Sequence, residues 1–466
     1  NKAEIQLKDM AGVPFEEYKV VDGEIVVGTD EGSQKWEEFL NQLTWEEMYQ
    51  LVNHGGYARW NVDSIGMPAQ NDNDGPTQLG FSAATSDGVN TVMGLTGMTT
   101  NFPPASLMAA TWNTEISYEF GRAIGDEALY INVQGWYGPS MNIHRTPFGG
   151  RNFEYLSEDG VLSGKMIAPA TRGAVEKGLV TYIKHMAVNE QETNRGGIFT
   201  WVTEQAMREI YLKPFEIAMK EGHSTGAMTS MNRIGNVRVF ANGALNDGIV
   251  HNEWNFKGIN VTDAAPASTE SYADLNALMR NGCDLPLNVW AFQDGSLEVH
   301  RFDTEENMVY VSPEGISGSR ANFDSTPDSE LTLASPTLYY NVRRAARHIL
   351  YATANSNGMR NGFVGDFEQE LTLNAAASGK ILSEYSLSDV EVEGNLPEGI
   401  TIDAEGRISG TPTSEGTYTV TIKCVVDGRM GVVNHIYRQF WQNGELVTID
   451  RTLGEKVSVT LTIVVK

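Results

Sequence analysis

Cysteine is nearly absent from this chain of 466 residues, which contains only Cys283 and Cys424. Two cysteines cannot build a disulfide scaffold or a metal site made of thiolates, so both classes of protein are excluded. Because the two residues lie far apart, we expect them to belong to separate domains, and they do not indicate a redox compartment.

Basic residues are also scarce. The chain has 34 Lys and Arg against 60 Asp and Glu, which gives a formal net charge of −26. Such a chain repels a nucleic acid or an anionic membrane surface, so neither is an expected partner. No run of apolar residues approaches the ~18 that a membrane span requires.

The first residues, Asn1-Lys2-Ala3-Glu4, are neither a Met start nor a signal peptide. We therefore expect a mature or cleaved product, and a secreted, periplasmic or cell-surface location is favoured over a cytoplasmic one.

The sequence has no Gly-x-Gly-x-x-Gly turn opening a helix and no P-loop, which argues against a doubly wound nucleotide-binding sheet. Helical patterns such as Thr114–Tyr130 and Thr203–Glu221 instead alternate with short apolar runs that end in polar residues. The expected strands are 135–143, 180–184, 226–231 and 258–262. This alternation predicts parallel βα units, and over residues 36–360 we expect a TIM-like (β/α)8 barrel.

The pattern changes after Tyr351. A turn-rich linker at 355–362 is followed by alternating segments such as Thr417–Lys423, which predict a small all-β sandwich over residues 361–466. The segment Leu396–Pro412 resembles the Ig-like, cadherin-like modules of bacterial surface proteins. The resemblance implies a spacer or packing module, with sugar binding as the alternative. Residues 1–35 are expected to form a linker-like segment.

A series of short motifs in the barrel half resembles glycoside hydrolase family 3, in its β-glucosidase/β-xylosidase branch. No single motif is decisive, but their order matches the family. The motifs are Asp74-Gly-Pro76, Phe102-Pro-Pro104, Ala109–Asn113, Gly138–Arg145, Gly149–Glu154, Glu158-Asp159, Lys184-His185, Asn189–Glu192, Arg208–Phe215 and Val261-Thr-Asp263.

The resemblance implies that Asp263 is the catalytic nucleophile of a retaining glycosidase. The residues themselves agree, because Asp263 follows a short buried strand and would face the mouth of a barrel. A retaining enzyme needs a carboxylate there to attack the anomeric carbon. The alternative is an Asp that caps the next helix.

The same resemblance implies that five other residues bind the sugar. They are Asp74, Arg151, Lys184, His185 and Met228. Asp74 could instead be an ordinary turn residue, and Glu154 could form a loop-holding ion pair with Arg145. Arg195 is assigned to structure. A Lys and a His at the end of an apolar strand are costly to bury unless a polar ligand fills the cavity. No metal and no cofactor are expected.

The chain departs from the family pattern at two positions: Ala264 replaces the Trp that usually follows the nucleophile, and Met231 replaces a Tyr. The segment after His185 also lacks the second His of the N-acetylglucosaminidase branch.

In the β-glucosidase branch an α/β sandwich domain supplies the Glu that acts as acid and base. No such domain follows the barrel in this sequence. We therefore expect it in an upstream segment or on a second chain. Two alternatives remain open, a non-catalytic carbohydrate-binding protein and a scaffold.

Overall fold

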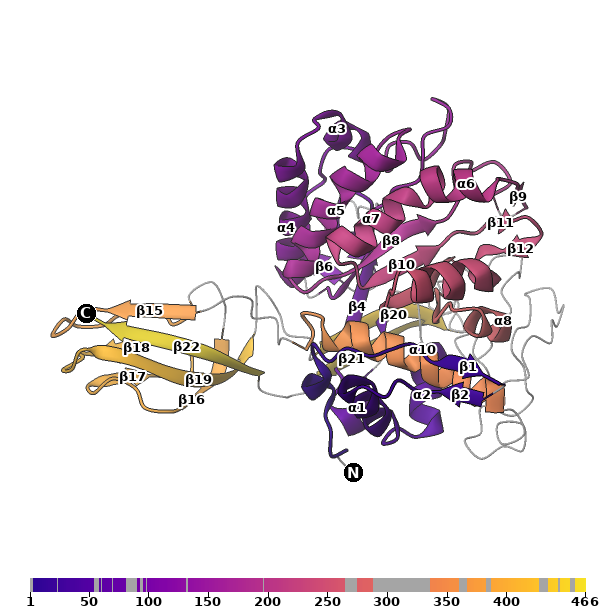
Figure 1. The fold of residues 1–466 in the computed structure, drawn as a ribbon. Coiled ribbons are helices and arrows are strands. Elements are labelled where there is room, and N and C mark those ends of the chain that lie inside the picture. Colours follow the sequence, from indigo (N-terminus) through magenta and orange to yellow (C-terminus); the bar gives the residue numbers. More distant parts are fainter. Residues whose placement is uncertain are drawn as a thin grey trace.

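A computed structural model describes most of the chain (Figure 1). The described residues are 3–22, 24–53, 58–59, 61–68, 70–80, 90–92, 95–97, 99–130, 133–195, 197–264, 275–287, 336–359, 367–382, 387–426, 435–442, 445–452 and 457–466.

A seven-stranded sheet forms the centre of the larger unit, in the order β14-β13-β10-β8-β7-β4-β3. Six strands are parallel and occur in chain order, while β3 pairs antiparallel with β4. β8 is buried along its whole length, as expected for a parallel strand covered on both faces. The strands are β3 (Ala58–Arg59), β4 (Gln70–Asp74), β7 (Gly135–Tyr137), β8 (Val180–Met186), β10 (Gly226–Thr229), β13 (Ile259–Ala264) and β14 (Leu285–Leu287).

Consecutive parallel strands in chain order are the arrangement expected for the wall of a barrel. The parallel α/β character of the prediction is therefore confirmed. Within the described residues the sheet has two free ends, because β3 and β14 are not paired with each other. The closed eight-stranded barrel stays a prediction, as do the boundaries at 36 and 360.

Helices cover both faces of the sheet (Figure 1). Ile183 and Ala227 face one apolar cluster, which includes residues of α5 and α7, and Tyr182 and Met228 face another, which includes α2 and α10. The helices are η1 (Leu7–Met10), α1 (Glu31–Leu40), α2 (Trp45–Asn53), η2 (Asp63–Ile65), α3 (Ala105–Ala110), α4 (Thr114–Tyr130), α5 (Gly160–Glu176), α6 (Glu204–Ala206), η3 (Met207–Tyr211), α7 (Lys213–Gly222), η4 (Val239–Ala241), η5 (Ala244–Glu253), α8 (Leu275–Arg280) and α10 (Pro336–Ala354).

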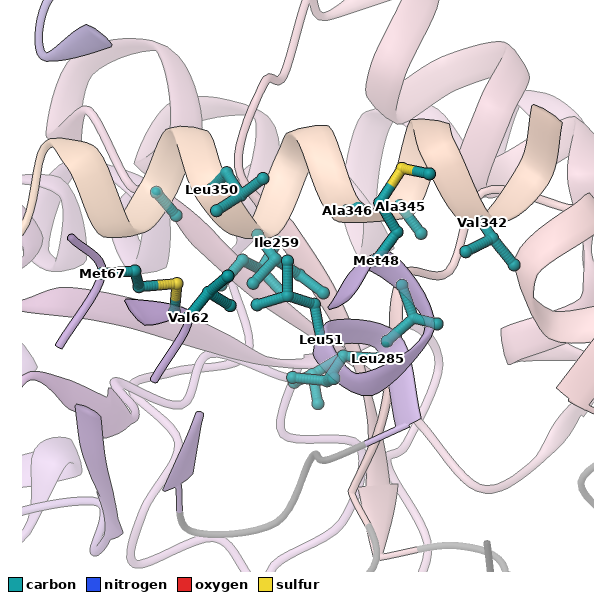
Figure 2. Packing of buried hydrophobic residues seen from close by; sticks show 14 of the residues in the cluster. Met48, Leu51, Val62, Met67, Ile259, Leu285, Val342, Ala345, Ala346 and Leu350 are labelled. Carbon is teal, nitrogen blue, oxygen red and sulfur yellow. The ribbon is translucent and has the colours of Figure 1, made fainter. Parts of the chain in front are cut away.

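α10 lies across the second face, where its apolar side chains meet α2 and the strands. Figure 2 shows Ala345, Ala346 and Leu350 of this helix near Leu51 and Ile259. Burial of these side chains removes apolar surface from water and so fixes α10 on the sheet. Among the described helices, none combines the length and the apolar character needed to span a bilayer.

The N-terminal residues, expected to be linker-like, contribute to this core. Leu7, Met10 and Phe15 are buried in the same cluster as α10. Asp30 caps α1 by accepting a hydrogen bond from the Ser33 backbone at 2.9 Å, which fixes the start of the helix. β1 (Lys19–Val21) and β2 (Glu24–Val26) form an antiparallel pair, which lies between Phe15 and α1 in the sequence.

Two elements differ from the sequence prediction. The helix expected over Thr203–Glu221 is divided into α6, η3 and α7, and α7 begins next to Pro214, which has no backbone N–H to continue the preceding helix. The strand expected over Gly135–Ile143 ends at Tyr137, two residues before Pro139, which likewise cannot donate to a strand ladder.

The larger unit also contains two smaller sheets. β5 (Asn90–Val92) pairs with β6 (Leu95–Gly97), and a three-stranded sheet joins β9 (Phe199–Thr200), β11 (Arg233–Ile234) and β12 (Val237–Arg238).

The C-terminal unit consists of β-strands with an apolar core of its own (Figure 1). A four-stranded sheet has the order β15-β22-β19-β16, and Ile400 and Ile408 of the β17–β18 hairpin share its core. The complete Ig-like sandwich stays a prediction. The strands of this unit are β15 (Phe367–Leu371), β16 (Leu387–Glu393), β17 (Ile400–Ile402), β18 (Ile408–Gly410), β19 (Gly416–Val426) and β22 (Val457–Val465). β20 (His435–Gln442) and β21 (Glu445–Thr452) pair in a separate two-stranded sheet, which Figure 1 draws near α10 and away from the four-stranded sheet.

A buried ionic cluster joins the N-terminal residues to α10 and the start of β14. The imidazole of His348 contacts Asp284 Oδ1 at 2.8 Å through Nδ1 and Glu17 Oε2 at 3.2 Å through Nε2. Arg347 and Lys257 also contact the Glu17 carboxylate, at 2.9 and 3.0 Å. Because both ring nitrogens face carboxylates, both donate, and the ring is held as a cation.

The pKa values of His348 and Glu17 are shifted in opposite directions. Burial alone would lower the pKa of His348, but the carboxylates of Asp284 and Glu17 raise it above its ordinary value. Burial alone would raise the pKa of Glu17, but His348, Arg347 and Lys257 hold it well below its ordinary value. The ion pair therefore stabilises the fold between these two pKa values.

We expect the free energy of unfolding to fall as the pH rises through the folded-state pKa of His348. The stabilisation from a raised His pKa is complete below the unfolded value, near 6.5, and every tenfold gain in the proton affinity of the ring is equivalent to about 1.4 kcal/mol. Urea denaturation at pH 6 and pH 9 measures the difference, and His348→Gln should reduce it. His223→Asn is the control, since His223 is exposed at the end of α7 with φ of 56°, which Asn tolerates. An unchanged pH dependence in His348→Gln would contradict this assignment.

Candidate functional site

A polar pocket of about 590 Å³ opens at the carboxyl ends of β4 and β8. Asp74 is the last residue of β4, and Lys184 lies near the end of β8, so both side chains project from the edge where parallel strands place functional groups. Arg151 comes from the loop after β7. The pocket is lined by Asp74, Gly75, Pro76, Thr77, Gln78, Gly80, Asn101, Phe102, Pro104, Arg151, Phe153, Glu154 and Lys184.

Asp74 and Lys184 form an ion pair across the pocket. Lys184 Nζ lies 2.5 Å from Asp74 Oδ1, and the lysine side chain is only 3% exposed, compared with 25% for Asp74. Gly75 follows with φ of 128°, and a Cβ at this position would lie 2.4 Å from the Gln78 carbonyl oxygen. Only glycine fits there, so the Asp74-Gly75 turn fixes the direction of the carboxylate.

Arg151 is held by Glu154. The Arg151 Nε group donates to Glu154 Oε1, and the hydroxyl of Ser140 donates to Glu154 Oε2 at 3.0 Å. Burial alone would lower the pKa of Arg151, but Tyr155, Glu154 and Asp263 raise it, so the guanidinium stays charged. The sequence allowed Glu154 to pair with Arg145, but Arg145 instead donates to the Tyr211 hydroxyl.

His185 is a neutral imidazole. Burial lowers its pKa well below the ordinary value, and the nearby cations Arg151, Lys184 and Arg195 lower it further. The Tyr155 hydroxyl accepts from the Asn189 amide at 3.0 Å and lies 3.1 Å from His185 Nδ1. The other ring nitrogen, Nε2, faces the Asp263 carboxylate at 3.7 Å, which favours the proton on Nε2. Nδ1 is then the acceptor for the Tyr155 hydroxyl.

Asp263 lies near the end of β13 with its side chain 12% exposed. Its Oδ2 is 3.7 Å from His185 Nε2, and its Oδ1 accepts a hydrogen bond from the Ala264 backbone at 2.6 Å. Among the described residues, the buried Oδ2 atom has no hydrogen-bond partner. One carboxylate oxygen is thus anchored, while the other is left for an interaction beyond those described.

The sequence-predicted site residues therefore come together, with one exception. Asp74, Arg151 and Lys184 line one pocket, and His185 next to Lys184 faces Asp263. Met228 is 2% exposed in the apolar cluster beside Val261, below the layer of these polar groups. Its role at the substrate stays a prediction.

Tyr155 was not singled out by the sequence, since it lies in an irregular loop next to the motif that ends at Glu154. We expect Tyr155→Phe to reduce kcat/KM for an aryl glycoside by roughly two- to tenfold, the worth of one neutral hydrogen bond. The reason is that His185 loses the donor that fixes its tautomer. Tyr118→Phe is the control, because Tyr118 bonds Glu176 on the outside of α4. Full activity in Tyr155→Phe would refute this positioning role.

One described group of side chains could hold a metal ion, and it lies outside the pocket. It consists of Glu17, His251 and His348 in the buried ionic cluster. The two nitrogens of His251 contact the carbonyl oxygens of Phe256 and Gly282, and Glu17 is already paired with two cations. These ligands are occupied, so the cluster suits an ion-pair network better than a metal.

Comparison with known proteins places two segments in families. Residues 61–289 match the family described as "Glycosyl hydrolase family 3 N terminal domain", and residues 367–429 match "Putative Ig domain". The match to the first family spans every residue of the candidate site.

Three relatives illustrate the similarity. β-Glucosidase A of Butyrivibrio fibrisolvens is 39% identical over 236 residues, which cover 49% of this chain and 27% of the relative. An exo-α-(1→6)-L-arabinopyranosidase of Bifidobacterium longum is 36% identical over 278 residues, or 59% of this chain and 34% of the relative. The solved structure of β-glucosidase 3B from Thermotoga neapolitana with glucose has 30% identity and a TM-score of 0.56, covering 70% of this chain and 43% of that one.

The chain thus spans about a third or less of these two curated relatives and under half of the solved structure. The matched segment includes the parallel sheet and the pocket at its carboxyl edge. Through residues 61–289, the chain belongs to glycosyl hydrolase family 3.

Proposed function

We propose that this chain carries the nucleophile of a retaining β-glycosidase, acting on β-glucosides or related sugars. The observation that carries the proposal is the Asp263 carboxylate, whose Oδ2 has no hydrogen-bond partner among the described residues and lies 3.7 Å from His185. The similarity to β-glucosidases supports the substrate class. The six parallel strands would form part of a TIM-like (β/α)8 barrel.

In the first step Asp263 Oδ2 attacks the anomeric carbon and forms a glycosyl ester. The bond to the leaving oxygen breaks, its electron pair stays with that oxygen, and an acid supplies a proton. In the second step water attacks the same carbon, the ester bond breaks, and the conjugate base takes the water's proton. Each step inverts the configuration at the anomeric carbon, so the two steps together retain it.

Four residues would hold the sugar. The Asp74 carboxylate accepts hydrogen bonds from hydroxyl groups, and Lys184 and Arg151 donate to them. The neutral His185 donates from Nε2 on the side of Asp263. These charge-assisted contacts give orientation, which places the anomeric carbon at the nucleophile.

The acid is proposed to come from an α/β sandwich domain, in an upstream segment or on a second chain. The carboxylates near the pocket are engaged, Glu154 with Arg151 and Glu192 with Arg195 at 3.2 Å. Glu190 is the candidate for an acid within this chain. Burial raises its pKa to about 7, even though hydrogen bonds from the Ile143 backbone and the Asn142 side chain lower it. Glu190 does not line the polar pocket.

Leaving-group dependence tests this proposal. We expect the isolated chain to hydrolyse a dinitrophenyl β-glucoside slowly and cellobiose scarcely at all, because only the activated leaving group departs without an acid. A 2-fluoro glycoside should label Asp263, identified by mass spectrometry of peptides. Glu190→Gln should leave the slow hydrolysis unaltered if the acid is external.

Three results would contradict the proposal. Cellobiose turnover at an ordinary enzyme rate, on the order of 1–1000 per second, would place the acid within this chain. A label on another residue would reject Asp263. Sugar binding with no turnover of any glycoside would favour a non-catalytic carbohydrate-binding protein.

A further inference from the structure

A second pocket, of about 390 Å³, adjoins the polar one. It lies between α3, α4 and α5, and its volume is within the range of small-molecule sites. We call it the apolar groove. The two pockets share four wall residues, Pro76, Thr77, Phe102 and Glu154, so they are direct neighbours.

The chemistry of the groove is opposite to that of the polar pocket. Most of its lining is hydrocarbon, including Leu107, Met108, Ile116, Phe120 and Ile167. Several polar groups at its walls are engaged with other described residues. Thr111 donates to the Met108 carbonyl at 2.7 Å, and Glu154 accepts from Ser140 and Arg151. Such a surface binds hydrocarbon and offers little to a sugar hydroxyl.

The strand order locates the groove relative to the sugar. Asp263 is on β13 and Asp74 on β4, with β10, β8 and β7 between them. A pyranose ring whose anomeric carbon meets Asp263 therefore directs its opposite end, carbons 4 and 6, toward Asp74. Pro76 and Thr77 follow Asp74 directly, so the groove begins beyond that end of the ring.

We propose that the apolar groove binds a hydrocarbon substituent on carbon 4 or 6 of the sugar held in the polar pocket. The substrate class is a β-glycoside whose sugar bears an acyl or aryl ester or an alkyl ether at its end distant from the anomeric carbon. This inference rests on the proposed function, since it takes the orientation of the sugar from Asp263.

Binding is measured by calorimetry in Asp263→Asn, so that no turnover is required. The probes are 4-nitrophenyl β-glucoside and its 6-O-butanoyl ester, with the 4-O-butanoyl ester as the second isomer. We expect one of the esters to bind at least about tenfold more tightly than the parent glucoside, because its chain leaves water for the groove.

Leu107→Asp and Ile116→Asp place a charge in the groove at side chains that are 55% and 50% exposed, so the fold should tolerate them. The affinity ratio of ester to parent should fall to within about threefold of one, since a charge cancels the gain from burying hydrocarbon. Val161→Asp is the matched control: Val161 is 51% exposed in the first turn of α5 and does not line the groove. It should keep the full ratio.

The outcomes separate the two proposals. If the parent binds and neither ester binds more tightly, the groove assignment is overturned and the proposed function stands. A preference for an ester that persists in Leu107→Asp and Ile116→Asp would place the substituent elsewhere and overturn it too. If neither the parent nor an ester binds, the sugar site itself is rejected, and the groove assignment with it.

Discussion

Replacing Asp263 by Asn should lower the turnover of an activated aryl glycoside by about 10⁴-fold, equivalent to about 5.5 kcal/mol of transition-state stabilisation. The amide has nearly the shape of the carboxylate, and its oxygen can still accept the hydrogen bond from the Ala264 backbone. What it lacks is the negative charge that forms the glycosyl ester. The fold should be unaffected, so the comparison isolates chemistry from stability.

The control for this change is Asp126→Asn, since Asp126 pairs with Lys177 on the outside of α4. Its turnover should equal that of the unaltered chain. A second variant, Asp263→Gly, leaves space for an added carboxylate, and formate should restore part of the turnover. Asp263→Asn with more than roughly a tenth of the original activity, measured by nitrophenol release, would show that this residue is not the nucleophile.

The strands that carry the site could be predicted because parallel strands have a simple signature. The expected strand over 180–184 corresponds to β8 at Val180–Met186, and the expected helix over Thr114–Tyr130 has these same bounds in the structure. A run buried on both faces is apolar throughout, and its polar end marks the edge where a ligand can lie. This signature sufficed for the α/β class and for the general position of Asp263.

The partners within the site could not be predicted from the sequence. Lys184 and Asp74 are 110 residues apart, and no local pattern shows that they form an ion pair. Tyr155 fixes the tautomer of His185 from a loop with no periodic pattern. These contacts depend on how strands order themselves in the sheet, which is a property of long-range packing.

The N-terminal residues also make long-range contacts that the local sequence pattern does not reveal. Residues 1–35 were expected to be linker-like, since local pattern cannot reveal a distant surface that needs covering. Leu7, Met10 and Phe15 are nonetheless buried against the core that includes α10, far away in the sequence. The burial of these side chains, together with the ion pairs of Glu17, fixes the segment against α10.

The second large effect is expected from Asp72→Ala. Arg59 and Asp72 are both 0% exposed, and Arg59 Nη2 lies 2.8 Å from Asp72 Oδ1. The Tyr182 hydroxyl donates to the same carboxylate at 3.0 Å, and Arg59 Nη1 donates to Thr353 at 2.8 Å. The pair therefore joins β3, β4, β8 and α10, directly below the layer that contains Asp74.

Removing the Asp72 carboxylate leaves Arg59 charged, buried and without its counter-ion, so the free energy of unfolding should fall by about 3–5 kcal/mol. Urea denaturation followed by tryptophan fluorescence measures the change in the unit that contains Arg59 and Asp72, since eight of the nine tryptophans precede residue 360. The double variant Arg59→Met, Asp72→Leu removes both charges and should recover much of the loss, because the desolvation of two ions disappears with them. If Asp72→Ala lowers stability by less than about 1 kcal/mol, water or another carboxylate must reach Arg59, and this buried pair does not hold β4 and the Asp74 carboxylate in place.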